Sequence, residues 1–189
     1  MKETKRLILV VISFPLLFQV PFAFADDDRH KNNKEWYKNK SDHDDDKHEK
    51  KYLTPVNNET FKQECGACHF AYQPGLLPSR SWQKNLSNLP SHFGEEVSLE
   101  PEQKSIISEY LNANAAENSS AKRARKILKS LRGQTPLRIT ETPYIREKHH
   151  ELNSNIFSRQ SVGSRSNCIA CHPSADQGNY DDDFVKIPK

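Results

Sequence analysis

Apolar positions recur at helical spacing in three stretches between residues 79 and 131. Neighbouring members lie one, three or four positions apart, which places them on one face of an α-helix. The three faces consist of Trp82, Leu86 and Leu89; of Ile106, Ile107, Tyr110 and Leu111; and of Ala124, Ile127, Leu128 and Leu131. Suitable signals for the start of a helix are Ser79 or Ser81 for the first face, and Ser98 with Pro101 for the second. Suitable signals for the end of a helix are Pro90 after the first face and Gly133 after the third. We therefore predict three helices over about 79–89, 98–111 and 119–131.

The flanking segments are less regular. A further short helix is predicted over residues 61–69, followed by an apolar loop with a Pro-Gly turn at 70–78. Residues 134–189 contain little periodic pattern and several Pro and Gly residues, and the stretch 140–142, before Pro143, is expected to be extended. The pattern predicts a mainly α protein, with a small helical domain at 53–132 and a loop-rich second segment at 133–189.

The first 25 residues have the pattern of a signal peptide. Basic residues precede an apolar run at 7–20, and Ala23 and Ala25 fit a small-x-small cleavage site. The run is short for a bilayer span of about 20 residues, so we favour cleavage over a membrane anchor and expect no membrane span afterwards. Residues 26–52 mix Asp, Lys and His with few apolar side chains, which predicts a charged, disordered leader; a weak metal-chelating tail is the alternative.

All four cysteines fall in two copies of one pentapeptide, C-x-x-C-H: Cys65-Gly66-Ala67-Cys68-His69 and Cys168-Ile169-Ala170-Cys171-His172. This pattern is the attachment signature of c-type haem. Two thiols at this spacing can each form a thioether to one vinyl group, and the histidine that follows can bind the iron. We predict two covalently bound haems c, attached through Cys65, Cys68, Cys168 and Cys171, with His69 and His172 as proximal ligands.

Other uses of a C-x-x-C pair fit less well. The two pairs are about one hundred residues apart, whereas zinc sites usually join such pairs by a short linker. A thioredoxin-like centre would have a βαβ pattern around a single pair, which is not visible here. Two strained disulfides would leave both trailing histidines unexplained. Two small domains, at 53–132 and 133–189, are therefore predicted to bind one haem each.

Composition and charge narrow the function further. The formal net charge is +3, and cleavage after residue 25 removes three basic residues and one acidic residue, which leaves +1. Haem propionates add negative charge, so nucleic-acid binding is not expected. An apolar fraction of 34% predicts a thin core, in which haem faces supply much of the buried surface. Because c-type haem is attached outside the cytoplasm, we predict a periplasmic protein of a Gram-negative bacterium.

The second axial ligand of each iron decides what the haems can do. If the predicted cleavage takes place, methionine is excluded by counting, because the only one, Met1, lies in the signal peptide. Outside the leader and the motifs, three histidines remain: His92, His149 and His150. His92 lies 23 residues after the first motif's histidine, and His149 lies 23 residues before that of the second. We predict His92 and His149 as distal ligands and keep His150 as the alternative to His149; Lys, Tyr or a vacant position stays open.

The chain resembles the bacterial dihaem cytochrome c family, often abbreviated DHC, over roughly residues 52–188. The resemblance is carried by the run ECGACHFAYQPGLLPSRSW at 64–82, HFG at 92–94, TPLRITETPY at 135–144, KHHE at 148–151 and CIACH at 168–172. It implies two covalent haems, bis-His iron and an electron-carrier role. The family's Lys-His-x-Glu pattern falls on 148–151 and favours His149. The resemblance also suggests a small high-spin cytochrome c or a membrane cytochrome b as partner.

These observations predict a periplasmic, low-potential electron-transfer protein that catalyses no bond chemistry, because bis-His iron has no open position. The alternative is a subunit of a periplasmic haem oxidoreductase, peroxidase-like or a reductase small subunit, with one ligand-accessible haem. A haem sensor or metal-handling protein is a third hypothesis, suggested only by the leader. Aromatic candidates for lining the haems, each equally suited to an ordinary core, are Phe70, Tyr72, Trp82, Phe93 and Tyr144.

Overall fold

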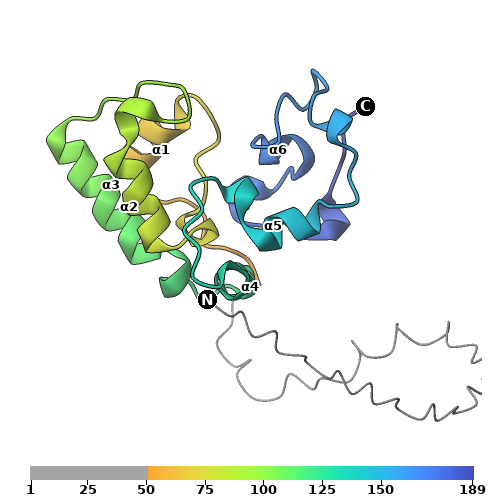
Figure 1. Cartoon of the computed structure of the whole chain (residues 1–189), viewed down its shortest axis with the longest axis horizontal. Helices are drawn as coiled ribbons and strands as arrows, with labels where there is room; N and C mark the ends of the chain where they lie inside the picture. The colour runs from red at the N-terminus through yellow and green to blue at the C-terminus, as the bar shows by residue number, and fades with distance from the viewer. Residues whose placement is uncertain (1–50) are drawn as a thin grey trace, which may run out of the picture. The chain divides into compact units, whose positions relative to one another are not determined.

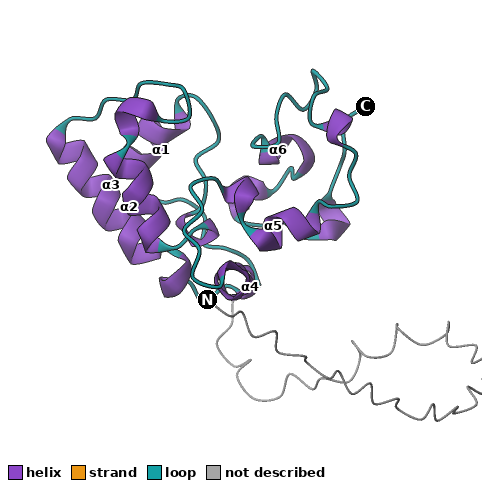
Figure 2. Cartoon of the chain, viewed as in Figure 1, coloured by secondary structure: helices purple, strands orange, loops and turns teal. Residues whose placement is uncertain are grey.

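The computed structural model describes residues 51–189 (Figure 1). The predicted signal peptide and nearly all of the predicted leader lie outside the described residues. The described part consists of helices and loops without a strand (Figure 2), and His92 and Glu95 form an isolated β-bridge. Its α-helices are α1 (Glu59–Gly66), α2 (Ser79–Ser87), α3 (Pro101–Asn114), α4 (Lys122–Leu131), α5 (Pro143–Lys148) and α6 (Cys168–Cys171). The mainly α fold class is confirmed. No helix in residues 51–189 is long and apolar enough to cross a membrane.

Helices α1 to α4 correspond to the four helices expected before residue 132, with shifted ends. Helix α3 begins after Glu100 rather than Ser98, because Glu100 and Gln103 form a reciprocal capping box. Helix α2 ends at Ser87, and the predicted last turn is a separate 3₁₀ turn at Leu89–Ser91. At the end of α4, Arg132 adopts a left-handed conformation with φ 47°, and Gly133 continues it with φ 87°.

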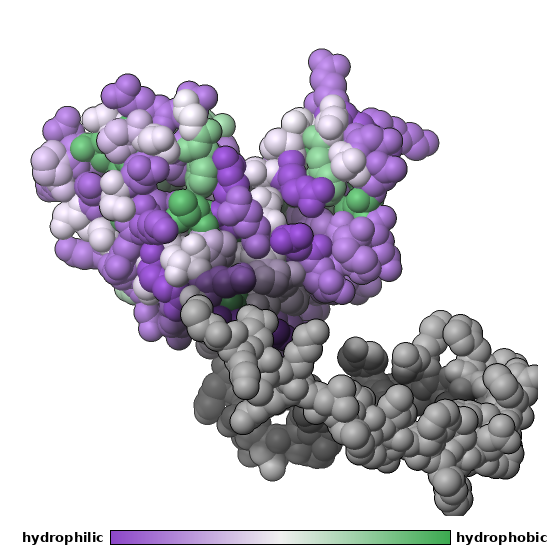
Figure 3. All heavy atoms as spheres, viewed as in Figure 1, coloured by the Kyte–Doolittle hydropathy of each residue, from purple (hydrophilic) through white to green (hydrophobic). Residues whose placement is uncertain are grey.

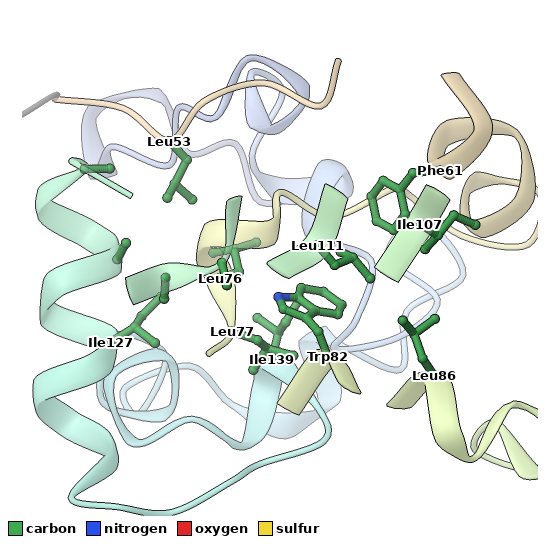
Figure 4. Close-up of a cluster of buried hydrophobic side chains, with 14 of the residues drawn as sticks. Leu53, Phe61, Leu76, Leu77, Trp82, Leu86, Ile107, Leu111, Ile127 and Ile139 are labelled. Atoms are coloured by element: carbon green, nitrogen blue, oxygen red, sulfur yellow. The ribbon is translucent and has the colours of Figure 1, made fainter. Parts of the chain in front are cut away.

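The core lies where α1, α2 and α3 pack together and where the loop at 73–78 meets them. Ile107 and Leu111, from one face of α3, are almost fully buried, as the spacing of the apolar residues predicts. Figure 4 shows Trp82 of α2 among side chains from several elements, including Leu111 and Leu77. The Trp82 indole Nε1 donates a hydrogen bond to the Pro74 carbonyl at 2.8 Å, so this tryptophan also holds the loop.

The second segment, residues 133–189, contains more local structure than its sequence pattern predicts. Helix α5 and the short α6 are joined by loops and 3₁₀ turns, and α5 packs on α4. The prediction of an extended stretch at 140–142 is wrong for residues 140 and 141, because Ile139–Glu141 form a 3₁₀ turn. The backbone N–H and the hydroxyl of Thr142 both donate hydrogen bonds to the Ile139 carbonyl and so close this turn. Helix α4 also contacts the 3₁₀ turn at Pro74–Leu76, so the domain boundary at 132 stays a prediction.

Apolar surface is visible among hydrophilic residues in both the α1–α3 region and the α5–α6 region (Figure 3). The exposed large apolar side chains include Phe93, in the first region, and Ile169, between the two cysteines of the second motif. Exposed apolar side chains of this kind are suited to contact a ligand or a partner protein.

Candidate haem sites

The first C-x-x-C-H motif starts in the last turn of α1 and continues into the following loop. Cys65 is half-buried and Cys68 is exposed, and both thiols are free. The His69 ring nitrogen Nδ1 lies 2.9 Å from the Phe70 carbonyl oxygen. Because a carbonyl can only accept, this hydrogen bond keeps the proton on Nδ1 and leaves the Nε2 lone pair available to a metal.

A tight turn after α2 presents His92 to the first motif. The backbones of His92 and Glu95 exchange two hydrogen bonds, of 2.8 and 3.1 Å, around Phe93 and Gly94. Phe93 has φ 57°, a left-handed conformation that is unfavourable for a residue with a side chain. The Arg138 guanidinium lies 3.8 Å from the centre of the Phe93 ring and so packs over the turn from the second segment.

His69 and His92 face each other across a cavity of about 640 Å³. Their ring centres are 6.4 Å apart and the rings are 20° from parallel. Two imidazoles that bind one metal from opposite sides have ring centres about 6 Å apart, since each metal–nitrogen bond is about 2 Å and each nitrogen lies about 1 Å from its ring centre. Cys65 and Cys68 line the same cavity, so the residues present fit a haem.

The second motif occupies α6 and the residue after it, and its partner histidine lies at the C-terminal end of α5. His149 directly follows α5, and its Nδ1 lies 2.7 Å from the Ile145 carbonyl, which again leaves Nε2 for a metal. The ring centres of His149 and His172 are 6.1 Å apart, with an interplanar angle of 74°. Both rings line a cavity of about 320 Å³ together with Cys168 and Cys171. This spacing too suits a single metal between two imidazoles.

His150, the alternative distal ligand, points elsewhere. Its side chain is 60% exposed, its Nδ1 bonds to the Glu147 carbonyl at 2.6 Å, and it lines neither cavity. The local reason is the end of α5: His149 follows the last helical residue and faces the cavity, whereas the next residue along the chain faces solvent. The geometry therefore favours His149 over His150.

Burial favours the neutral form of two candidate iron-binding imidazoles, those of His172 and His92. Burial, with smaller effects of His149 and Arg123, lowers the pKa of His172 to about 4. Burial also lowers the pKa of His92, assisted by His69 and Arg138. A neutral imidazole is the form that binds a metal, so both side chains are ready to do so at neutral pH.

The two cysteine pairs line different cavities, so they do not form the shared four-thiolate site that a zinc centre would need. Burial raises the pKa of Cys65 and of Cys168 to about 11, so these thiols are protonated at neutral pH before they react. They therefore lack the thiolate character of a nucleophilic cysteine.

Four of the five predicted aromatic liners, Phe70, Tyr72, Trp82 and Phe93, line the first cavity. Tyr144 lines neither cavity and instead lies near Arg123. Three further lining residues were not predicted from the sequence: Tyr180 and Phe157 at the second cavity and Arg138 at the first. Nothing in their local spacing distinguishes them, because long-range folding brings them to the sites.

Two cavities, each with the thiols of a C-x-x-C-H motif and a facing pair of imidazoles on a helical scaffold, define a c-type cytochrome with two haem sites. The model of the dihaem cytochrome c family matches residues 61–180 of this chain. The chain belongs to that family. Family membership implies two covalently bound c-type haems, and the residues that line the two cavities fit them.

Solved structures of this family are similar to the chain in sequence and in fold. A dihaem cytochrome c from Rhodobacter sphaeroides is 41% identical, with a TM-score of 0.58, over 68% of this chain and 100% of that chain. A dihaem cytochrome type c from Shewanella baltica OS155 is 36% identical, with a TM-score of 0.57, over 69% of this chain and 93% of that chain. No curated protein matches the chain.

Proposed function

We propose that this dihaem cytochrome c is an electron-transfer protein of the periplasm that passes electrons between partner proteins and catalyses no bond chemistry of its own. The two facing imidazole pairs, 6.4 and 6.1 Å apart, are the observation that carries the proposal. If both positions on each iron are held by imidazole, no position is left for a substrate, and one-electron chemistry is what remains.

In this proposal, thioethers from Cys65 and Cys68 hold the first haem, and thioethers from Cys168 and Cys171 hold the second. The proximal ligands are His69 and His172, and the distal ligands are His92 and His149. Imidazole on both faces favours ferric iron more than methionine does, so both haems have low reduction potentials.

Low-temperature electron paramagnetic resonance of the oxidised, full-length holoprotein tests the ligand set directly. We expect two low-spin ferric signals and no high-spin signal. His92→Ala should convert only the first haem to a high-spin or water-bound form, and His149→Ala only the second. His150→Ala is the matched control, because it removes a neighbouring imidazole that faces away from the cavity.

Two results would contradict the ligand assignment: a single-histidine variant, His92→Ala or His149→Ala, with an unchanged low-spin spectrum, or a wild-type high-spin signal. Carbon monoxide separates the proposed carrier from the alternative of a haem oxidoreductase subunit. A bis-His carrier in its reduced form should not change its visible spectrum when the gas is added, whereas a ligand-accessible haem would show a shifted Soret band.

The proposed partners are a small high-spin cytochrome c or a membrane cytochrome b, as the family resemblance suggests. Stopped-flow mixing of the reduced holoprotein with each oxidised candidate should show rapid oxidation of this protein by at least one of them. The proposed compartment is tested by mass spectrometry of the mature N-terminus in periplasmic extract, where cleavage after Ala25 is expected. A protein retained in the cytoplasm with an intact N-terminus would contradict the export proposal.

A further inference from the structure

The two haem cavities share part of their lining. Ile139, Val162, Ser164 and Asn167 contribute to both, although the two motifs are far apart in the sequence. The elements that carry the proximal histidines therefore meet, and the contacts between them determine how far apart the two sites lie. Three side chains make hydrogen bonds between these elements: Tyr72, Gln73 and Tyr180, together called the tyrosine–glutamine bridge below.

Tyr72 joins the first haem site to the attachment segment of the second. Its ring stacks on His69, with ring centres 5.1 Å apart and an angle of 29°. Its hydroxyl donates a 2.6 Å hydrogen bond to the carbonyl of Ser166, two residues before Cys168. One side chain thus contacts the proximal histidine of one site and the chain that leads into the cysteines of the other.

Gln73 and Tyr180 make the second half of the bridge. The Gln73 side chain is buried, with a relative exposure of 1%. Its amide donates a 2.5 Å hydrogen bond to the Ala175 carbonyl, and its Oε1 accepts a 2.6 Å hydrogen bond from the Tyr180 hydroxyl. The Tyr180 ring in turn lies 5.4 Å from the ring of His172, the other proximal histidine.

These contacts have the properties of a rigid connection. Buried hydrogen bonds that are fully paired define a single geometry, because a buried polar group left unpaired is unfavourable. Tyr72 contacts His69, and Tyr180 contacts His172. Gln73, the residue after Tyr72, is hydrogen-bonded to Tyr180 and so connects the two contacts. The side-chain hydrogen bonds of these three residues join the loop after the first motif to the residues that surround the second.

We infer that Tyr72, Gln73 and Tyr180 are positioning residues that hold the two haem sites at a fixed separation and so determine how fast an electron passes from one site to the other. The inference rests on the proposed electron-transfer function. When bound, the haems supply a one-electron exchange in which one ferrous iron is oxidised and the other, ferric, iron is reduced. The contribution of the three side chains is to hold the two sites in position. The tyrosine hydroxyls and the glutamine amide keep their protons during the electron exchange.

The test uses the full-length holoprotein with Gln73→Leu, Tyr180→Phe and the double variant. The readout is the rate of electron exchange between the two haems within half-reduced molecules, taken from exchange broadening of the haem methyl signals in paramagnetic NMR. We expect each single variant to exchange electrons between its two haems measurably more slowly than the wild type. Because both changes remove the same hydrogen bond, the double variant should be little slower than the slower single variant.

Tyr110→Phe is the matched control. It removes a phenolic hydroxyl that accepts a 3.3 Å hydrogen bond from the Asn57 N–H, and Tyr110 lines neither cavity. Its exchange rate should equal that of the wild type. Pulsed electron paramagnetic resonance of the oxidised proteins gives a second readout, in which the distribution of iron–iron distances should broaden in the bridge variants and not in the control.

A bridge variant with two intact low-spin haems and a wild-type exchange rate would overturn the inference, as would additive effects in the double variant. If Tyr180→Phe does not fold, Tyr72→Phe must give the same slowing, because it breaks the bond to Ser166. Failure of the proposed function is a different result: the wild type would exchange no electrons with any partner, while its internal exchange rate could still respond to these variants.

Discussion

Arg138 is expected to hold the distal histidine of the first haem in place, although it contacts no iron. Its guanidinium lies 3.8 Å from the centre of the Phe93 ring, and Phe93 is the residue that follows His92 in the sequence. The same guanidinium also forms a 3.7 Å ion pair with Glu141. We predict that Arg138→Ala makes the His92 turn open more often and so lets an added ligand compete better for the first iron.

The expected increase in open turns follows from two free energies of similar size: the backbone strain at Phe93 and the Arg138–Phe93 contact that offsets it. Phe93, with φ 57°, costs about 1 kcal/mol relative to an ordinary backbone conformation. The Arg138 side chain is 42% exposed, so its contact with the ring stabilises the turn by about 0.5–1 kcal/mol. Loss of that contact multiplies the open population by about two to five, and the apparent affinity for a competing ligand rises by the same factor.

Titration of the ferric holoprotein with imidazole, a ligand that is neutral above its own pKa, checks this prediction at the first haem. Glu141→Gln is the matched control, because it removes the ion pair and keeps the stacked guanidinium, so its imidazole affinity should be unchanged. Arg138→Lys keeps the charge and loses the planar contact, and should resemble Arg138→Ala. An Arg138→Ala protein with wild-type imidazole affinity, or with a change only at the second haem, would refute the reasoning.

Two further predictions concern stability. Thermal unfolding should show that Gly178→Ala destabilises the fold by about 1–3 kcal/mol more than Gly133→Ala does. Both glycines have positive φ, but only at Gly178 would the new Cβ overlap the Leu53 carbonyl. Equal losses of stability in the two variants would contradict this prediction. The pKa of His172 is lowered from 6.5 to about 4 in the folded chain, mainly by burial. Between these values the unfolded haem-free chain binds more protons than the folded haem-free chain. The free energy of unfolding of the haem-free protein should therefore fall as the pH drops from 6.5 to 4 and should be insensitive to this group above 6.5; a flat profile in denaturant titrations of the haem-free protein would count against it.

Much of the chemistry could be predicted from local spacing. A thiol, two residues, a second thiol and an imidazole form a unit whose function depends on five neighbouring positions, so the haem attachments needed no knowledge of the fold. Given the predicted cleavage of the signal peptide, counting was also sufficient to exclude methionine as a ligand and to reduce the histidine candidates for the distal positions to three. Helix faces such as the one with Ile107 and Leu111 could be predicted for the same reason, because helical periodicity is local.

The tertiary structure decided the relations between distant residues. His149 and His150 are adjacent and chemically identical, and only the end of α5 directs one to the cavity and the other to solvent. Gln73 and Tyr180 are 107 positions apart and no periodic pattern links them, yet they share a buried hydrogen bond between the two sites. Sequence by itself determines which groups can bind iron, because that chemistry resides in single side chains and short spacings. Which of these groups face each other depends on packing between segments far apart along the chain, and only the folded structure contains that information.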